Sequence, residues 1–242
     1  MALNDVFIQG YQKIQENEYD SQLQYLSIVA EARNIPVEFI TKASGVFIPN
    51  NEFMLNNFGP EIQLYDCYRD GLCVWDNAVI FPIKNVNSEV VAFAGFYPFE
   101  YLDESTGKNY YGYSSKDVFT KGNFLFFPQN NLKKAIQDGY LMVVDGLFDA
   151  ISLCGHGFNA ASLMGSNVTP GIVMQLRLVS NVIVVADNDQ VGYDLYKNIK
   201  KQIQHTTIFQ QDKTKDIDEL LKSDDASWGI QALNATVANI VG

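Results

Sequence analysis

Histidine, cysteine and basic side chains are scarce in this chain. Its 242 residues include 2 histidines and 3 cysteines, none in a CxxC pair, so we expect neither a disulfide framework nor a zinc site. No apolar run is long enough to cross a bilayer and no signal peptide opens the chain, which predicts a cytoplasmic protein without a membrane partner. The 17 Lys and Arg face 28 Asp and Glu, and the net charge of −11 argues against a broad basic surface for nucleic acid.

Hydrophobic residues, in contrast, are plentiful. They make up 47% of the chain and charged residues 19%, which is typical of an ordered protein with one large or two small domains. Residues 1–34 and 37–42 are expected to be helical, and residues 71–100 to form strands of a mostly antiparallel sheet with a turn at Asn85. A helix at 128–138 follows a tyrosine-rich insertion, residues 101–117.

From residue 140 onward, short apolar runs alternate with helical patterns. Such alternation predicts an α/β fold with a parallel sheet and right-handed crossovers, preceded by the α+β segment described above. We expect strands at 140–145, 159–162, 181–186 and 206–210, helices at 147–156, 169–179 and 190–204, and two further helices after 217 and 227.

Pairs of aspartates follow three of these strands. Open α/β sheets bind their ligands at the carboxyl ends of the strands, so the three pairs are expected to converge. In the first pair the second acid lies one helical turn after the first, on the same helix face. The pairs are Asp145 with Asp149, Asp187 with Asp189, and Asp216 with Asp218.

Carboxylates grouped in this way suit divalent cations. Mg²⁺ takes oxygen ligands and usually keeps several waters together with substrate phosphate, and two such ions about 3.5–4 Å apart promote phosphoryl transfer. We expect Asp145, Asp187 and Asp189 to bind metal, and the other three acids to hold a second ion or to order the first. The alternative is that each acid only caps a helix.

Four motifs, in order, resemble the TOPRIM domain of DnaG-type bacterial primases across residues 137–222. They are Val143-Val-Asp-Gly-Leu-Phe-Asp149, Asn159-Ala-Ala-Ser-Leu-Met-Gly165, Asp187-Asn-Asp-Gln-Val-Gly192 and Lys215-Asp-Ile-Asp218. Upstream, Phe81-Pro-Ile, Val90-Val-Ala-Phe-Ala-Gly95 and Phe119-Thr-Lys-Gly122 resemble the N-terminal subdomain of the primase core. A TOPRIM signature alone also fits topoisomerases, nucleases and ribosomal-RNA maturases, and the upstream motifs favour the primases.

The resemblance implies an N-terminal subdomain over 1–136, a TOPRIM metal-binding domain over 137–212, and an acidic pair with a helical tail over 213–242. It implies an enzyme, a DNA-directed RNA polymerase that makes short RNA primers on single-stranded DNA from NTPs with Mg²⁺ or Mn²⁺. The six aspartates match the family's acids, with Asp145 in place of a glutamate. A replicative helicase or another replisome protein is the expected partner.

Four residues are expected to contact template or nucleotide. Lys121 matches a lysine of the family that faces them, and Lys84 and Lys116 add positive charge in the same subdomain. Tyr111 offers a ring on which a base can stack. The alternative for Tyr111 and the aromatic residues around it is packing of the insertion against the sheet.

Several features depart from the family. Asp145 reaches about 1.5 Å less far than glutamate, one C–C bond, and Ala78 and Phe96 stand where the family tends to have arginine. Residues 1–100 hold five Lys and Arg and thirteen Asp and Glu, a net charge of −8. We expect neither a zinc-binding domain before the core nor a helicase-binding domain after it, which indicates a phage or mobile-element protein.

These departures motivate two alternatives to a primase. The first is a non-catalytic, primase-like protein whose acidic surface binds and regulates a helicase or a host primase. The second is a TOPRIM nuclease, which would cut nucleic acid without NTPs. The upstream motifs argue against the nuclease.

Overall fold

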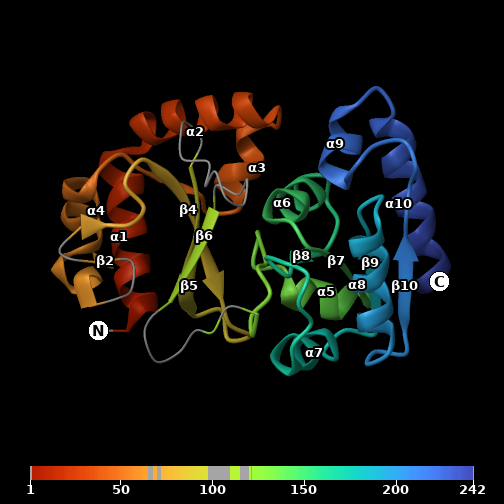
Figure 1. The fold of residues 1–242 in the computed structure, drawn as a ribbon. Helices are drawn as coiled ribbons and strands as arrows, with labels where there is room; N and C mark the ends of the chain where they lie inside the picture. The colour runs from red at the N-terminus through yellow and green to blue at the C-terminus, as the bar shows by residue number, and fades with distance from the viewer. Residues whose placement is uncertain are drawn as a thin grey trace. The chain divides into compact units, whose positions relative to one another are not determined.

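The computed structural model describes residues 2–64, 68–69, 72–97, 110–114, 120 and 122–241. The chain divides into two compact units, Met1–Lys121 and Gly122–Gly242 (Figure 1). Within the described part of the chain, no helix is long and apolar enough to cross a membrane.

Three helices open the first unit. They are α1 (Leu3–Asn17), α2 (Tyr19–Arg33) and α3 (Val37–Lys42), so the helical stretch predicted over 1–34 is two helices. The break lies at Glu18, whose backbone N–H donates to Ile14 at the end of α1 and whose carbonyl accepts from Gln22 at the start of α2. The two helices can therefore pack on different strands, α1 on β5 and α2 on β1.

The first unit contains the predicted antiparallel sheet, with strand order β1-β4-β5-β6. Its strands are β1 (Val46–Ile48), β4 (Ala78–Lys84), β5 (Val90–Phe96) and β6 (Tyr110–Ser114). The predicted turn at Asn85 is also found, because the Asn85 side-chain oxygen accepts from the backbone N–H groups of Asn87 and Glu89 at 2.9 and 3.0 Å. Smaller elements are α4 (Asn51–Phe58), a 3₁₀ helix (Pro60–Leu64), and the paired strands β2 (Tyr68–Arg69) and β3 (Leu72–Cys73).

The buried amide of Gln22 protects the edge strand of this sheet. Its nitrogen donates to the Phe47 carbonyl at 2.9 Å, and its oxygen accepts from the Phe47 N–H at 2.8 Å. An edge strand otherwise presents unpaired backbone groups, so this one side chain completes the hydrogen bonding of β1 and fastens α2 to it.

The second unit contains the predicted parallel sheet, with strand order β10-β9-β7-β8. Along β7, Leu141 and Val143 pack into one core and Met142 and Val144 into another, so the strand is buried on both faces. Parallel sheets require this double burial because helices cover both faces. The strands are β7 (Tyr140–Val144), β8 (Ala160–Ser162), β9 (Asn181–Val185) and β10 (Thr206–Phe209).

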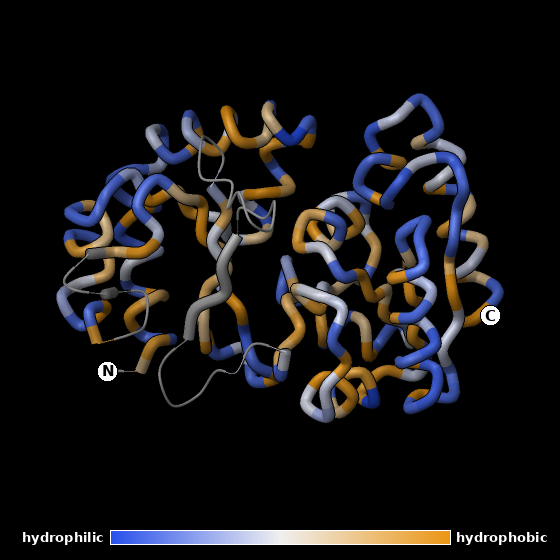
Figure 2. Tube along the Cα trace, in the orientation of Figure 1, coloured by the Kyte–Doolittle hydropathy of each residue, from blue (hydrophilic) through white to orange (hydrophobic). Residues whose placement is uncertain are grey.

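Helices of this unit sort into two layers by the core to which they contribute. One layer is α5 (Leu132–Asp138), α7 (Pro170–Leu176) and α8 (Gln190–Lys200). The other is α6 (Leu147–Gly155), α9 (Ile217–Lys222) and α10 (Ala226–Val241). Hydrophobic and hydrophilic residues follow one another along the helices of both units (Figure 2). The predicted fold class is confirmed, with the helical tail in place.

Residues 122–136 pack with the second unit. Phe126 forms an antiparallel bridge with Ser162, and its N–H and carbonyl each bond to that residue at 2.8 and 2.9 Å. The helix predicted at 128–138 begins only at Leu132, because a turn precedes it in which the Asn130 N–H donates to the Phe127 carbonyl at 3.2 Å and Asn130 has φ +50°. The compact unit thus starts earlier than the predicted TOPRIM domain, and the division into functional domains at 136 and 212 stays a prediction.

Candidate active site at the carboxyl ends of the parallel strands

The first acidic pair lies where β7 turns into α6. Asp145 follows the strand and is half-buried, and its carbonyl accepts from the Ser162 hydroxyl at 2.9 Å and from the Gly165 N–H at 3.1 Å. Asp149 lies in the first turn of α6. A Cβ atom at Gly146 would come within 2.0 Å of an Asp149 carboxylate oxygen, so glycine at this position leaves room for that carboxylate.

The second pair follows β9. Asp187 is half-buried, and Asp189 is exposed and caps α8, because its Oδ1 accepts from the Gly192 N–H at 2.8 Å. A Cβ atom at Gly192 would lie 2.6 and 2.7 Å from the Asp187 carbonyl oxygen and amide nitrogen. The start of α8 therefore rests directly on the backbone of Asp187.

The third pair begins α9. Asp216 caps this helix by accepting from the Glu219 N–H at 2.8 Å, and the Glu219 side chain in turn accepts from the N–H of the preceding Lys215 at 2.9 Å. Asp218 is buried, and its backbone N–H donates to Asp149 Oδ1 at 3.2 Å. The third pair is thereby joined to the first.

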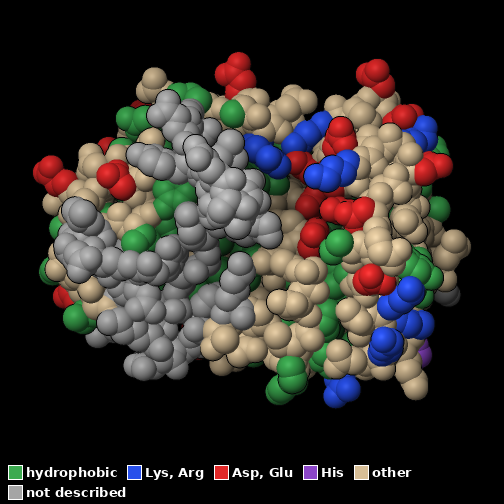
Figure 3. All heavy atoms as spheres, viewed as in Figure 1, with side chains coloured by type: hydrophobic (Ala, Val, Ile, Leu, Met, Phe, Trp, Pro, Cys, Tyr) green, Lys and Arg blue, Asp and Glu red, His purple; other side chains and the backbone are tan. Residues whose placement is uncertain are grey.

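A backbone bond joins the second pair to the third as well. The Asn188 N–H, between Asp187 and Asp189, donates to the Lys215 carbonyl at 2.9 Å. The structure therefore brings together the three pairs that the sequence places at separate strand ends. Figure 3 shows acidic side chains gathered on one face with lysine or arginine side chains beside them.

The carboxylates act on one another electrostatically. Burial raises the pKa of Asp149 well above its usual value, and the charges of Asp216, Asp218, Asp187 and Asp145 raise it further. Burial also raises the pKa of Asp187 to about 7, with contributions from Asp145, Asp216 and Asp189 and an opposing one from Lys215. Such repulsion is what a bound cation relieves.

The donors fit a hard cation that is only partly enclosed by protein. Among the described residues, no three His, Cys, Asp or Glu side chains are grouped so that they could hold a metal ion together. Mg²⁺ is usually bound through one or two carboxylates, with water and substrate phosphate completing its octahedron. The aspartates of this site, which repel one another, can supply the one or two carboxylates that such an ion needs.

The raised pKa values predict that the metal-free protein loses stability as pH rises. Between pH about 4 and 7 the folded state holds a proton on Asp187 that the unfolded state has released, so unfolding becomes easier as pH rises and this proton is lost. The raised pKa of Asp149 acts in the same direction. For Asp187, which is partly exposed, we expect an effect of about 1–2 kcal/mol after solvent screening. Urea unfolding in EDTA at pH 5 and pH 7.5 measures it. Asp187→Asn should be more stable than wild type at pH 7.5, and an unchanged pH dependence in that variant would contradict the assignment.

The predicted nucleic-acid contacts are only partly described. Lys84 ends β4 in the first unit and is half-buried, which lowers its pKa. Tyr111 lies in β6, where its backbone pairs with Gly95. Lys116 and Lys121 lie outside the described residues, as does the side chain of Tyr111.

Two residues of the site were missed by sequence reasoning. The buried Ser152 hydroxyl donates to Asp218, and the Lys222 ammonium forms an ion pair with the same carboxylate. Lys222 stands four residues after Asp218 in α9, a spacing that indicates an ion pair on a helix. Ser152 and Asp218 are 66 residues apart, and no local pattern predicts that they meet.

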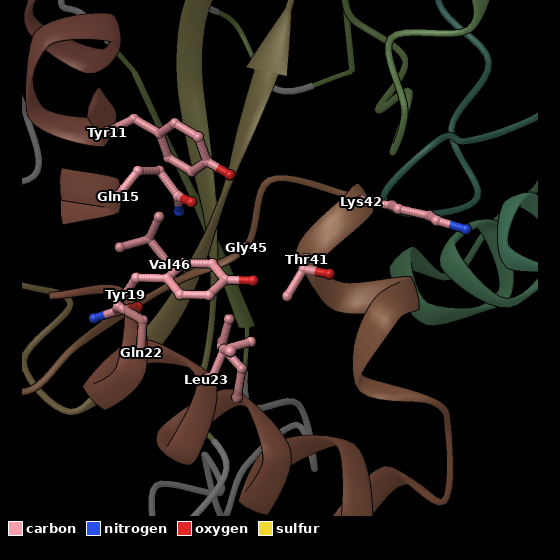
Figure 4. Close-up of a pocket in the computed structure, with 10 residues that line it drawn as sticks. Tyr11, Gln15, Tyr19, Gln22, Leu23, Thr41, Lys42, Gly45 and Val46 are labelled. Carbon is pink, nitrogen blue, oxygen red and sulfur yellow. The ribbon is translucent and has the colours of Figure 1, made fainter. Parts of the chain in front are cut away.

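A pocket in the first unit is unrelated to these acids. It has a volume of about 240 Å³, and Tyr11, Tyr19 and Gln22 from the first two helices and Thr41 from α3 are among its lining residues (Figure 4). None of the six aspartates lines it.

The sequence of this chain is similar to a known protein family and to bacterial DNA primases. A Toprim-like family model matches residues 142–221. A DNA primase of Thermotoga maritima is 27% identical over 146 residues, which are 56% of this chain and 25% of that primase. A DNA primase of Buchnera aphidicola is 23% identical over 205 residues, 82% of this chain and 30% of that protein, a stretch that reaches both units. The chain thus spans a quarter to a third of the length of these primases.

Solved structures share the fold. A structure described as the DnaG catalytic core superposes with a TM-score of 0.72 at 22% identity and covers 93% of this chain and 76% of its own. Another, described as the DnaG primase catalytic domain bound to ssDNA, has a TM-score of 0.71 at 19% identity, with 96% and 80% covered. Both units of the chain therefore take part in the likeness.

Proposed function

We propose that this chain, which carries a TOPRIM domain of the DnaG-primase type, is a primase catalytic core that synthesises short RNA primers on single-stranded DNA. The observation that carries the proposal is the meeting of three acidic pairs at the strand ends of that domain, linked by the bonds of Asp218 to Asp149 and Asn188 to Lys215. Curated relatives are DNA primases, and one solved structure with this fold is described as bound to ssDNA.

In the proposed reaction, a 3′ hydroxyl oxygen attacks the α-phosphorus of an NTP, and pyrophosphate leaves. Asp145, Asp187 and Asp189 would hold Mg²⁺ or Mn²⁺ ions with one or two carboxylates to each ion, and the ions would supply Lewis-acid stabilisation of the charge on the reacting phosphate. Asp149 and Asp216 border these ligands and contribute the field that favours a cation. The exposed and half-buried carboxylates leave this edge of the sheet open to a triphosphate.

Template contact is proposed for the first unit and the segment that follows it. Lys84, Lys116 and Lys121 would contact phosphates, and Tyr111 would stack on a base. We also propose that a replicative helicase recruits the protein, since a unit with a net charge of −8 over residues 1–100 gains little from DNA charge alone. A phage or mobile-element origin belongs to the same proposal.

The direct test incubates the purified protein with single-stranded DNA, labelled NTPs and Mg²⁺ or Mn²⁺, with and without its helicase. We expect short labelled RNA that depends on template and on divalent metal. Folded protein that binds Mn²⁺ yet makes no RNA in any condition would overturn the proposal.

The acidic first unit favours one other function, that of a non-catalytic regulator of a helicase or a host primase. A regulator would bind that partner and change its activity while incorporating no nucleotide itself. Cleavage of nucleic acid without NTPs would instead indicate the TOPRIM nuclease.

Gly146→Ala tests how closely Asp149 is held. Alanine suits the backbone at this position, with φ −83°, but its Cβ would displace the Asp149 carboxylate. We expect priming to fall roughly tenfold because misplaced catalytic groups cost rate, while the unfolding midpoint stays within a few degrees. Gly157→Ala serves as a control, since no atom lies within 4 Å of its added Cβ and its strain, at φ +90°, affects stability alone. If Gly146→Ala primed at the wild-type rate, the position of the Asp149 carboxylate beside residue 146 would not matter for activity.

A further inference from the structure

The six aspartates of the site differ in how much they are enclosed. Asp218 is 5% exposed, whereas the other five are half-buried or exposed. Its Oδ1 accepts a hydrogen bond from the Ser152 hydroxyl, and its Oδ2 pairs with the Lys222 ammonium, whose side chain is itself 17% exposed. Each carboxylate oxygen therefore already has a protein partner, and the Lys222 ammonium beside Oδ2 repels a cation from this carboxylate.

The backbone of the same residue contacts the cluster. The Asp218 N–H donates to Asp149 Oδ1 at 3.2 Å. Asp149 and Ser152 are three residues apart on α6 and so lie on one face of that helix. Two bonds thus connect α6 with the start of α9, one from Ser152 to the Asp218 side chain and one from the Asp218 N–H to Asp149.

We infer that Ser152, Asp218 and Lys222 act as a positioning group that sets the place of the Asp149 carboxylate, and that Asp218 is not a metal ligand. Ser152 fixes the first turn of α9 against α6, and the Asp218 N–H then holds Asp149. Lys222 offsets part of the charge of Asp218, whose carboxylate is among those that raise the pKa of Asp149.

The energetics support this arrangement. A buried charge whose partner is removed is strongly destabilising, so Asp218 depends on Lys222 in the fold. The pair lies at i and i+4 on α9, a spacing that keeps the ammonium over the carboxylate. Asp218 and Lys222 are therefore better suited to form a buried ion pair that holds α9 in place than to bind a metal ion.

The first experiment separates a positioning role from metal ligation without using catalysis. It measures Mn²⁺ affinity of the full chain by electron paramagnetic resonance in wild type, Asp218→Asn/Lys222→Met and Asp187→Asn. The double variant replaces the ion pair with a neutral pair and keeps the N–H at 218. We expect its Mn²⁺ affinity within threefold of wild type, and at least a tenfold loss in Asp187→Asn. A tenfold loss in the double variant would overturn the inference and make Asp218 a ligand.

The second experiment rests on the proposed function and uses Ser152→Ala, which retains helix propensity and charge. We expect kcat for priming to fall roughly tenfold with KM for NTP within threefold, measured well below the unfolding temperature. A purely structural bond would lower the unfolding midpoint and leave kcat of the folded protein unchanged, and that outcome would overturn the positioning role. If wild type makes no RNA, the proposed function fails, while the Mn²⁺ measurements still decide whether Asp218 is a ligand.

Discussion

Replacing Asp187 and Asp189 together by asparagine is expected to reduce primer synthesis by at least a thousandfold. The two carboxylates follow β9, and Asp187 interacts electrostatically with Asp145, Asp189 and Asp216. Loss of both removes two of the three carboxylates proposed to hold the catalytic ions, whose stabilisation of transition-state charge amounts to several kcal/mol. Incorporation of labelled NTP on single-stranded DNA measures the loss.

Asparagine is the informative replacement because it keeps the fold of the loop. Asp189 caps α8 through the Gly192 N–H, and an asparagine oxygen can accept the same bond. Alanine at this position would also remove the cap, at a cost of about 1 kcal/mol, and would mix instability with the loss of charge. Asp187→Asn relieves repulsion, so the double variant should unfold no more readily than wild type at neutral pH.

Asp194→Asn is the matched control. This aspartate is exposed on the same helix, where it lies 3.6 Å from the Lys197 ammonium and accepts from Gln190 at 2.9 Å. Asp194→Asn removes one negative charge, as each substitution of the double variant does. We expect its priming activity to stay within twofold of wild type. If the double variant kept a tenth of wild-type synthesis, the acids after β9 would not be the metal ligands.

Much of this site follows from the sequence because Asp145 and Asp187 come directly after buried strands. Apolar runs before Asp145 and Asp187 predict buried strands, and parallel strands bring their carboxyl ends to one edge. The structure confirms the strand and helix order after residue 140, and the relatives confirm the resemblance to the TOPRIM domain of DnaG-type primases. Hydrophobic periodicity was thus enough to predict the strands and helices and the sheet edge at which the acids meet.

Sequence patterns could not separate the roles of the acids, because those roles depend on contacts between distant segments. Asp216 and Asp218 stand two residues apart, yet one caps a helix and the other is buried against Ser152. The break at Glu18 was missed for a similar reason, since no proline or glycine marks it and only the packing of α1 and α2 on different strands requires it. Tertiary contacts override local propensity in both places.

Gly192→Ala is expected to lower both stability and activity, against the usual effect of this substitution. Alanine inside a helix normally stabilises by about 0.5–1 kcal/mol relative to glycine. Here the added Cβ would meet backbone atoms of Asp187 at 2.6 and 2.7 Å, and backbone cannot move aside as a flexible side chain can. We therefore expect a loss of about 1–3 kcal/mol, the range for overpacked sites, and at least a tenfold fall in priming.

The two losses have one cause, which is the displacement of α8 from the end of β9. Asp189 caps that helix through the amide of residue 192, so a shift of its first turn moves Asp189 relative to Asp187. Asn198→Ala, at an exposed position of α8, should instead gain a few tenths of a kcal/mol and leave priming unchanged. Urea unfolding and primer synthesis on both variants provide the comparison. A gain of stability in Gly192→Ala would contradict the close contact between the start of α8 and the backbone of Asp187.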